Sequence, residues 1–375
     1  MNILFYLTKY PSVGGIENVT NIIASELIKE HKISVISHIS QDAPVVNGIT
    51  IYRMPNAHVW LAKENFEYAE KIVSDNQFNA IIYQDSYAPT EKIACCVAEH
   101  HNIPLYVFEH NSPLFIYKKR DLDPITTPKG FLRRLLHPYL LHKEINRKRY
   151  LLKHCTMYVL LSKEFIPEFC NLIGADTNDS RITYINNPAI EVVKEKNVPK
   201  ENIILCVSRL AREKCVDEMI RMWSDLSFQL PEWRFIIVGD GPERGKLESM
   251  VREMNVPRVV FTGFAEPTNY YQRAKIFWMT SKYEGWGMTL IEAMQQGCVP
   301  IAYKTFSSIV DIIDDGRNGY LISPDDTQAF IDHSILLAND NTLRSVLAES
   351  AIKKVEEFAI SHIVKEWINL LKIYA

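Results

Sequence analysis

The chain has 375 residues, of which 47% are hydrophobic and 23% are charged. This composition is ordinary for a soluble globular protein and excludes a disordered chain, a collagen-like chain and a small disulfide scaffold. At about 100–200 residues per domain, the length predicts two domains. The formal net charge is −3, so the total charge gives no indication of a nucleic-acid partner.

Several features predict a cytoplasmic protein. The seven cysteines form no C-x-x-C or C-x-x-H pattern, so we expect free thiols in a reducing compartment. The segment Met1–Tyr10 lacks the basic region of a signal peptide. No apolar stretch approaches the roughly 18 residues that a membrane-spanning helix needs.

The first half of the chain alternates short apolar runs with helical patterns. Helices are expected at Glu17–Lys29 and Thr90–Glu99. Strands are expected at Ile3–Thr8, Ile33–Ile39, Ile49–Met54, Phe78–Tyr83, Leu105–Glu109 and Met157–Leu161. Continuous apolar runs favour parallel strands buried on both faces, so this series predicts a doubly wound sheet.

The segment Ile116–Lys153 is strongly basic. Eleven Lys and Arg residues oppose three acids, which gives about +8 here and about −11 elsewhere. Apolar residues recur among them at helical spacing, namely Leu132, Leu135, Leu136, Tyr139 and Leu140. Such a helix can lie on an anionic membrane, but for the apolar stripe we favour packing on the core. For the cations we favour an anionic partner, because like charges repel unless they are neutralised. The expected surface is Lys118, Lys119, Arg120, Arg133 and Arg134.

The alternation of strand and helix patterns is interrupted at Asn186–Asn202, which we interpret as a linker, and then resumes. Further strands are expected at Ile203–Ser208, Phe235–Gly239, Val259–Thr262, Ile276–Thr280 and Val299–Ala302, and a last helix at Ala359–Ile373. The predicted domains are therefore 1–187 and 201–355, with 356–375 as a C-terminal helix packing back toward the first. Two such domains facing a cleft would bind ligands at the carboxyl ends of their strands.

Candidate site residues lie at those strand ends. Gly14 and Gly15 open the first helix, where backbone amides can approach an anion, although a tight turn explains them too. Arg209 and Lys214 follow the first strand of the second domain, where they could grip a phosphate. Gly239 belongs to a Gly-Asp-Gly-Pro turn that we interpret mainly as structural. His110 ends a strand on the ligand side.

The most informative motif is a pair of glutamates, Glu284 and Glu292, separated by a Gly-rich turn into a helix. Carboxylates accept hydrogen bonds from pairs of sugar hydroxyls, so two of them could hold a ribose and a second sugar. The backbone amides of Gly285–Met288 could meet phosphate or sugar oxygens. Two weaker motifs are discounted: Asp121-Leu122-Asp123 lies in the cationic segment, and Ser162 has no G-x-S-x-G elbow around it.

These residues resemble those of glycosyltransferase family 4, the retaining sugar transferases of GT-B architecture. The resemblance covers nearly the whole chain and is densest from Val207 to Ala302, where Glu284 and Glu292 match the family's E-x7-E signature. It implies two Rossmann-like domains facing a cleft. It also implies catalytic roles for His110, Arg209, Lys214 and Glu284, and donor binding by Gly14, Gly15, Ser208, Gly239, Gly285, Trp286, Gly287, Met288, Thr289 and Glu292.

The implied roles are specific. Arg209 and Lys214 would hold the donor diphosphate, Glu284 the transferred sugar, and Glu292 the ribose. The sequence departs from the pattern at three places: Cys215 and Pro188 stand where glycine is common, and Trp286 where phenylalanine is frequent. Cys215 would be strained if its position needs a positive φ.

The resemblance implies a metal-independent retaining enzyme that moves a sugar from a nucleotide-diphosphate donor, by default a UDP-sugar, to a hydroxyl. We expect a lipid-linked or polysaccharide-precursor acceptor, bacterial cell-surface glycan synthesis, and peripheral contact with the inner face of the plasma membrane. Two alternatives stay open, a nucleotide-sugar epimerase of GT-B-like fold and a non-catalytic scaffold that binds sugar nucleotides or lipid.

Overall fold

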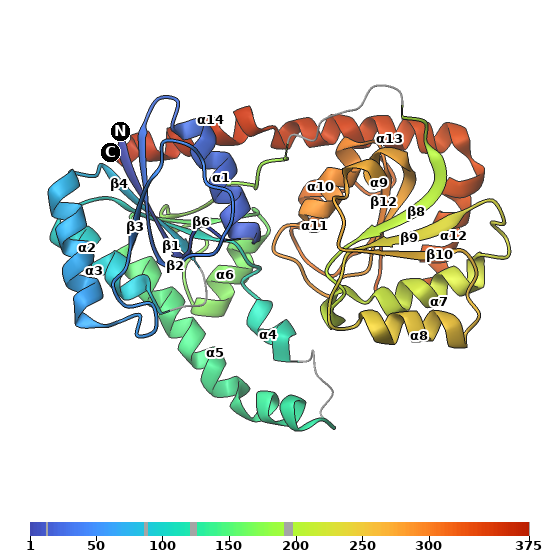
Figure 1. Ribbon diagram of the computed structural model, residues 1–375, viewed down its shortest axis with the longest axis horizontal. Helices are drawn as coiled ribbons and strands as arrows, with labels where there is room; N and C mark the ends of the chain where they lie inside the picture. The colour runs from blue at the N-terminus through green and yellow to red at the C-terminus, as the bar shows by residue number, and fades with distance from the viewer. Residues whose placement is uncertain (13, 86–88, 121–125, 191–197, 375) are drawn as a thin grey trace. The chain divides into compact units, whose positions relative to one another are not determined.

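The computed structural model describes residues 1–12, 14–85, 89–120, 126–190 and 198–374. It divides into two compact units (Figure 1). Among the described residues, unit 1 comprises those in 1–120, 126–188 and 360–374, and unit 2 comprises those in 189–359. Unit 2 therefore begins twelve residues before the predicted start of the second domain and ends four residues after its predicted end. The predicted Asp121-Leu122-Asp123 motif lies outside the described residues.

Unit 1 is built on a seven-stranded parallel sheet of order β3-β2-β1-β4-β5-β6-β7. Its strands are β1 (Asn2–Lys9), β2 (Lys32–Ile39), β3 (Thr50–Arg53), β4 (Ala80–Asp85), β5 (Leu105–Glu109), β6 (Met157–Leu160) and β7 (Ile182–Tyr184). Its helices are α1 (Gly15–Leu27), α2 (Lys63–Asn76), α3 (Glu91–His100), α4 (Phe115–Arg120), α5 (Pro128–His154), α6 (Phe165–Ile173) and α14 (Ile360–Tyr374). The central strands are buried along their length, as the continuous apolar runs predict.

The C-terminal helix α14 completes the core of unit 1. Trp367 stacks on Phe108 of β5 with ring centroids 3.8 Å apart. The hydroxyl of Tyr106 donates to the carbonyl of Leu371 at 3.3 Å. The last residues of the chain thus cover strands formed from its first third.

Unit 2 holds a six-stranded parallel sheet of order β10-β9-β8-β11-β12-β13. Its strands are β8 (Glu201–Val207), β9 (Arg234–Val238), β10 (Val259–Gly263), β11 (Ala274–Met279), β12 (Val299–Tyr303) and β13 (Tyr320–Ile322). Its helices are η1 (Arg212–Lys214), α7 (Val216–Leu226), α8 (Arg244–Glu253), α9 (Thr268–Arg273), α10 (Met288–Gln295), α11 (Ile309–Ile312), α12 (Thr327–Asn339), α13 (Asn341–Val355) and η2 (Glu356–Phe358).

Every predicted strand overlaps an observed one, and two strands were missed. Both β7 and β13 are three-residue edge strands, and such short strands carry no long apolar run to reveal them. The start of β8 also lies inside the predicted linker. The predicted fold class, two Rossmann-like doubly wound sheets, is confirmed.

The long helix α5 corrects one prediction. Thr127 caps it by accepting from the amide of Gly130 at 3.0 Å, and Pro128 occupies its first turn. Its first turns lie beyond the sheet of unit 1 (Figure 1). The apolar stripe does not pack on the core there, because its residues are 40% to 67% exposed: Leu132, Leu135, Leu136, Tyr139 and Leu140.

Candidate active site

The strongest constellation lies at the topological switch point of unit 2. Strands β8 and β11 are neighbours, and the chain order runs outward from them in both directions. Ligands of open α/β sheets bind outside the carboxyl ends of such a strand pair. Arg209 and Lys214 follow β8, and Glu284 follows β11, so the topology brings these predicted residues together.

Lys214 and Glu284 form an ion pair across that switch point. The Lys214 Nζ donates to Glu284 Oε1 at 2.5 Å, and both side chains are less than one-fifth exposed. Arg209 pairs with the carboxylate of Glu213, which sequence analysis missed, and keeps 69% of its side chain exposed. Two cations therefore stand at the strand ends, each oriented by a carboxylate.

The backbone fixes the loop that carries these cations. The Glu213 carbonyl accepts from the amide of Lys282 at 2.8 Å. The hydroxyl of Thr280 donates to the carbonyls of Lys214 and Cys215 at 3.1 and 3.0 Å. Cys215 has φ +50°, so the predicted conflict is real: a buried cysteine occupies the left-handed conformation that glycine adopts without strain.

Gly239 supports the loop from the neighbouring strand β9. It has φ +135°, and a Cβ there would lie 1.9 Å from the carbonyl oxygen of Ser208. We expect Gly239→Ala to lower the free energy of unfolding by about 2 kcal/mol, because the strained backbone must move Ser208 and Arg209. Urea titration measures this.

Gly245, in the first turn of α8, provides the matched control. A Cβ at Gly245 meets no atom within 4 Å, so Gly245→Ala should stabilise the helix by about 0.5–1 kcal/mol. Equal effects of the two substitutions would contradict the close approach at Gly239.

The glycine-rich turn after Glu284 delivers the first amides of α10. Gly287 caps the helix with φ +101°, and Met288 and Thr289 form its first turn, where unpaired amides favour an anion or a sugar oxygen. For Trp286, the expected contact with the donor is made by the backbone amide. Its ring is 2% exposed and packs edge-on against Phe358 at 5.4 Å, so the side chain belongs to the packing of unit 2 and only its backbone is placed for a ligand.

Glu292 lies one turn into α10 and is half-buried. Its Oε2 accepts from the hydroxyl of Tyr271 at 2.8 Å. Burial raises the pKa of Glu292 to about 7, against the lowering effect of the Tyr271 hydrogen bond and with a further increase from Glu266. Tyr271 sits 21 residues upstream, and its carbonyl accepts from Lys200 at 3.0 Å. No local pattern in the sequence indicates that Tyr271 contacts Glu292 or that Lys200 contacts Tyr271.

The raised pKa predicts a pH-dependent stability. Glu292 is protonated more readily in the folded state than in the unfolded chain, so its ionisation destabilises the protein. The loss of stability is on the order of 2 kcal/mol and develops as the pH rises from the pKa of this glutamate in the unfolded chain through about 7. Glu292→Gln should therefore raise the melting temperature at pH 8 and change it little at pH 5. An equal rise in melting temperature at pH 5 and pH 8, measured by calorimetry, would contradict the raised pKa of Glu292.

In unit 1 the predicted residues lie along the carboxyl edge of the sheet. His110 follows β5, is 9% exposed, and its Nε2 contacts Gln84 Oε1 on the adjacent strand β4. Gly14 caps α1 after β1, and a Cβ there would lie 2.2 Å from the carboxylate of Glu17, whereas Gly15 faces open space.

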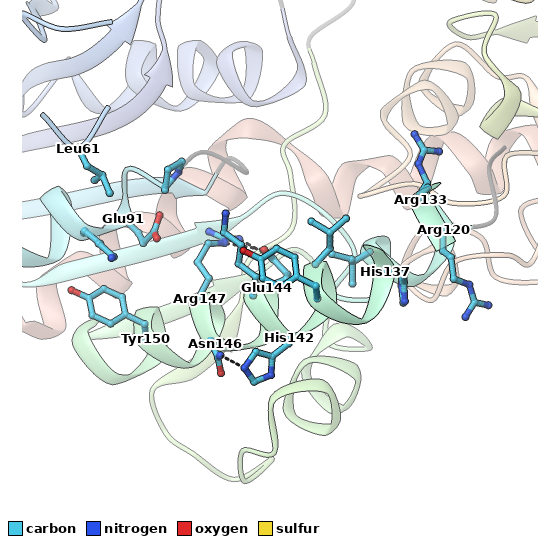
Figure 2. A pocket seen from close by; sticks show the side chains of 16 residues that line it. Leu61, Glu91, Arg120, Arg133, His137, His142, Glu144, Asn146, Arg147 and Tyr150 are labelled. Carbon is cyan, nitrogen blue, oxygen red and sulfur yellow. Dashed lines mark hydrogen bonds and ion pairs between the residues drawn. The ribbon is translucent and has the colours of Figure 1, made fainter. Parts of the chain in front are cut away.

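A pocket of about 840 Å³ opens in unit 1 between α3, α4 and α5 (Figure 2). Apolar side chains form much of its wall, and five cationic side chains line it against two carboxylates, Glu91 and Glu144. Of the predicted surface cations, Arg120 and Arg133 line this pocket. Lys118 lies on α4, where burial lowers its pKa against the effect of Glu168. Arg134 is half-buried, and the side chain of Lys119 lies outside the described part.

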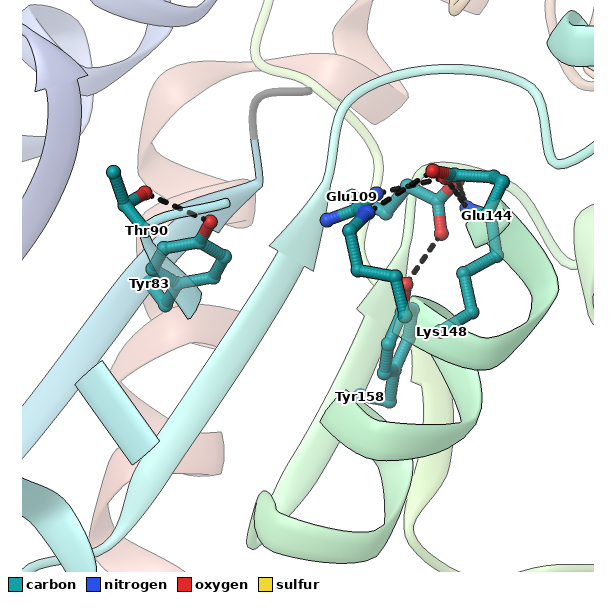
Figure 3. Close-up of polar contacts among 7 residues, drawn as sticks. Tyr83, Thr90, Glu109, Glu144, Lys148 and Tyr158 are labelled. Atoms are coloured by element: carbon teal, nitrogen blue, oxygen red, sulfur yellow. Dashed lines mark hydrogen bonds and ion pairs between the residues drawn. The ribbon is translucent and has the colours of Figure 1, made fainter. Parts of the chain in front are cut away.

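Other cations of the basic segment are neutralised inside unit 1, which corrects the idea that the whole segment awaits an anionic partner (Figure 3). Lys148 is 3% exposed and pairs with Glu109, whose other oxygen accepts from Tyr158 at 2.6 Å. Arg147 donates to both oxygens of Glu144, at 2.7 and 3.0 Å. Sequence analysis missed Glu109 as the charge partner of Lys148 and Tyr158 as a hydrogen-bond donor to Glu109.

Within the described residues, one group of side chains could hold a metal ion: Glu70, His100 and His101, on α2 and at the end of α3. None of these is a predicted site residue. No helix in the described ranges combines the length and apolarity needed to cross a membrane.

Comparisons with known proteins agree with this geometry. Residues 189–354, in unit 2, match the family model of glycosyl transferases group 1. The chain is 26% identical, over 99% of its length and 98% of the relative's, to the GalNAc-α-(1→4)-GalNAc-α-(1→3)-diNAcBac-PP-undecaprenol α-1,4-N-acetyl-D-galactosaminyltransferase of Campylobacter jejuni. It is 28% identical, over 56% of its length and 46% of the relative's, to a poly(ribitol-phosphate) α-N-acetylglucosaminyltransferase of Staphylococcus aureus.

Solved structures share the fold. Anabaena HepE, crystallised with UDP and glucose, superposes with a TM-score of 0.73 at 16% identity and 99% coverage of both chains. The lipopolysaccharide outer core galactosyltransferase WaaB superposes with a TM-score of 0.70 at 18% identity and complete coverage of both chains. Unit 2 therefore matches the group 1 glycosyltransferases, and the whole chain is similar to a full-length glycosyltransferase relative and shares its fold with the GT-B neighbours.

Proposed function

We propose that this glycosyltransferase is a retaining, metal-independent enzyme that moves a sugar from a UDP-sugar to a hydroxyl of a lipid-linked or polysaccharide-precursor acceptor in bacterial cell-surface glycan synthesis. The observation that carries the proposal is the convergence of Arg209, Lys214 and Glu284 at the switch point of unit 2. The undecaprenol-linked substrate in the name of the Campylobacter relative supports the acceptor class, and HepE bound to UDP supports the donor.

The chemistry follows from charge development. The bond between the anomeric carbon and the diphosphate breaks, and its electron pair goes to the leaving phosphate. The acceptor oxygen bonds to the same carbon, and its proton passes to the departing phosphate. Arg209, Lys214 and the first amides of α10 would stabilise the negative charge, and Glu284 would hold the hydroxyls of the transferred sugar. Ionised Glu292 would accept from the ribose hydroxyls.

The residues of unit 1 complete the proposal. His110 would act on the transferred sugar, and Gly14 and Gly15 would bring backbone amides toward the diphosphate and the acceptor. The exposed apolar stripe of α5 and its cations would lie on the anionic inner face of the plasma membrane, where a lipid-linked acceptor resides.

Incubation of the purified protein with UDP-glucose, UDP-galactose and their N-acetyl forms, with and without a bacterial lipid extract and with EDTA throughout, tests this proposal. We expect UDP release that depends on the lipid extract, and an α-linked product by NMR. Interconversion of the nucleotide-sugars without lipid would identify an epimerase. Tight donor binding with no turnover under every condition would identify a scaffold.

A further inference from the structure

Three side chains on the surface of unit 1 converge between two helices. Glu70 lies on α2, His100 is the last residue of α3, and His101 caps that helix. Figure 1 shows α2 and α3 side by side. The ligand atoms of the three residues, one carboxylate oxygen and two imidazole nitrogens, all lie within 4.8 Å of one another. The proposed transfer chemistry uses none of these residues.

The contacts show how two neighbouring histidines reach the same carboxylate. Successive residues of a helix point about 100° apart, so adjacent side chains do not face each other. His100 uses its near nitrogen, Nδ1, at 2.9 Å from Glu70 Oε2, and His101 uses its far nitrogen, Nε2, at 2.8 Å from the same oxygen. The ring centroids lie 5.0 Å apart. Both imidazoles therefore present a nitrogen to one oxygen.

Two imidazoles and one carboxylate form a donor set that zinc sites use with a water molecule in the fourth position. Tetrahedral Zn²⁺ holds nitrogen and oxygen at about 2.0–2.2 Å, which places neighbouring ligand atoms about 3.4 Å apart. Small side-chain rotations convert the present spacing into that one. Hard cations such as Mg²⁺ prefer sets of oxygens, so the two nitrogens favour Zn²⁺.

The surface beside the cluster is negative. Burial, and then the charges of Glu70 and Glu99, raise the pKa of the Cys96 thiol, which lies one helical turn before His100. The side chain of Glu70 is 27% exposed and that of His101 is 24% exposed, so water reaches only part of each. A carboxylate in such a partly shielded position gains more from a bound cation than a fully exposed one does.

The place of the cluster in the fold indicates a structural role. Helix α3 ends at His100, and the chain then enters β5 at Leu105, so the cluster lies toward the amino ends of the parallel strands. His110 follows the other end of β5. Ligands of such sheets bind at the carboxyl ends of the strands, so an ion at the amino end holds helices together rather than substrate.

We propose that Glu70, His100 and His101 bind one Zn²⁺ that joins α2 to α3, with a water molecule in the fourth position. Each imidazole coordinates through the nitrogen that faces Glu70 in this structure. The proton on that nitrogen moves to the other ring nitrogen of the same residue, or to solvent where the imidazole was charged. The inference goes beyond the proposed function and does not depend on it.

Isothermal titration of the metal-free full-length protein with ZnCl₂, under a phosphine reductant, tests the site. We expect one Zn²⁺ per chain. Glu70→Gln keeps the shape of the side chain but not its charge, and His101→Ala removes one ligand, so each should weaken Zn²⁺ binding by at least about tenfold. No Zn²⁺ binding by the wild type, or unchanged affinity in both variants, would overturn the proposal.

His58→Ala is the matched control, because His58 is an exposed histidine of the same unit outside the cluster. It should leave the affinity for Zn²⁺ within about twofold, since it removes no ligand. Excess Mg²⁺ should not displace Zn²⁺ from the wild type. A loss of affinity in His58→Ala equal to that in His101→Ala would place the ion elsewhere on the chain.

Thermal unfolding tests whether the ion joins the helices. Zn²⁺ at about 100 times its dissociation constant should raise the melting temperature of the wild type by about 5 °C, and that of Glu70→Gln by about half as much or less. Circular dichroism before heating shows whether each variant is folded. An equal rise in both proteins would contradict a joint made by Glu70.

The rate of UDP release separates this inference from the proposed function. At room temperature the rate should be the same with Zn²⁺ as with EDTA, because the cluster lies at the opposite end of β5 from His110. Loss of transfer in EDTA while the protein stays folded would refute the structural role. Absence of UDP release under every condition would remove the proposed function and leave the zinc titration unaffected.

Discussion

Replacement of Lys214 by alanine is expected to lower kcat by about 10²–10³, because it removes one of the charges that meet the leaving diphosphate. The ammonium is already oriented by Glu284 at 2.5 Å and shielded from water, so little reorganisation is needed when charge develops. The measurement is the initial rate of UDP release with saturating donor and lipid extract.

Lys246→Ala is the matched control for Lys214→Ala. Lys246 lies on α8 of the same unit, is 71% exposed and pairs only loosely with Glu243 at 3.6 Å, so its removal should change the rate by less than about twofold. Lys214→Arg should retain more activity than Lys214→Ala, since the charge stays. An undiminished rate in the alanine variant would refute the role of Lys214.

The Lys214–Glu284 contact also predicts non-additive effects. Residues that orient one another act as a unit, so the double variant Lys214→Ala, Glu284→Gln should lose less activity than the product of the single losses. Strictly multiplicative losses would show that each residue meets the donor independently of the other.

The donor-side residues were predictable because their signals are local. Arg209 and Lys214 follow one apolar run, Glu284 follows another, and the α/β rhythm alone places the ends of such runs at one edge of a sheet. Their partners could not be found in this way. Tyr271 reaches Glu292 from a separate helix, and no pattern in the sequence indicates that contact. Glu213 was visible beside Arg209, but its burial depends on the packing of the loop against Lys282.

The basic segment shows a second limit. Counting charges treats all cations alike, yet Lys148 is buried against Glu109, and Arg120 and Arg133 line a pocket. The helical period of α5 was correct. Which face of α5 is covered depends on how far the helix extends past the sheet, and the apolar period alone does not contain that length.

Lys148→Ala is expected to lower the free energy of unfolding by about 3–5 kcal/mol, because it leaves the Glu109 carboxylate buried without its cation. Both side chains are 3% exposed, and Tyr158 then supplies the remaining hydrogen bond shown for that carboxylate, at 2.6 Å. Urea titration followed by circular dichroism measures the change.

Lys153→Ala, on the last turn of the same helix and exposed, should change stability by less than about 0.5 kcal/mol. The double variant Glu109→Gln, Lys148→Met should recover much of the loss, since neither position of the pair then carries a charge and Arg147 still neutralises Glu144. Because Glu109 immediately precedes His110, Lys148→Ala should also slow transfer at temperatures where the variant stays folded. Similar small effects of Lys148→Ala and Lys153→Ala would show that the ion pair contributes nothing to unit 1.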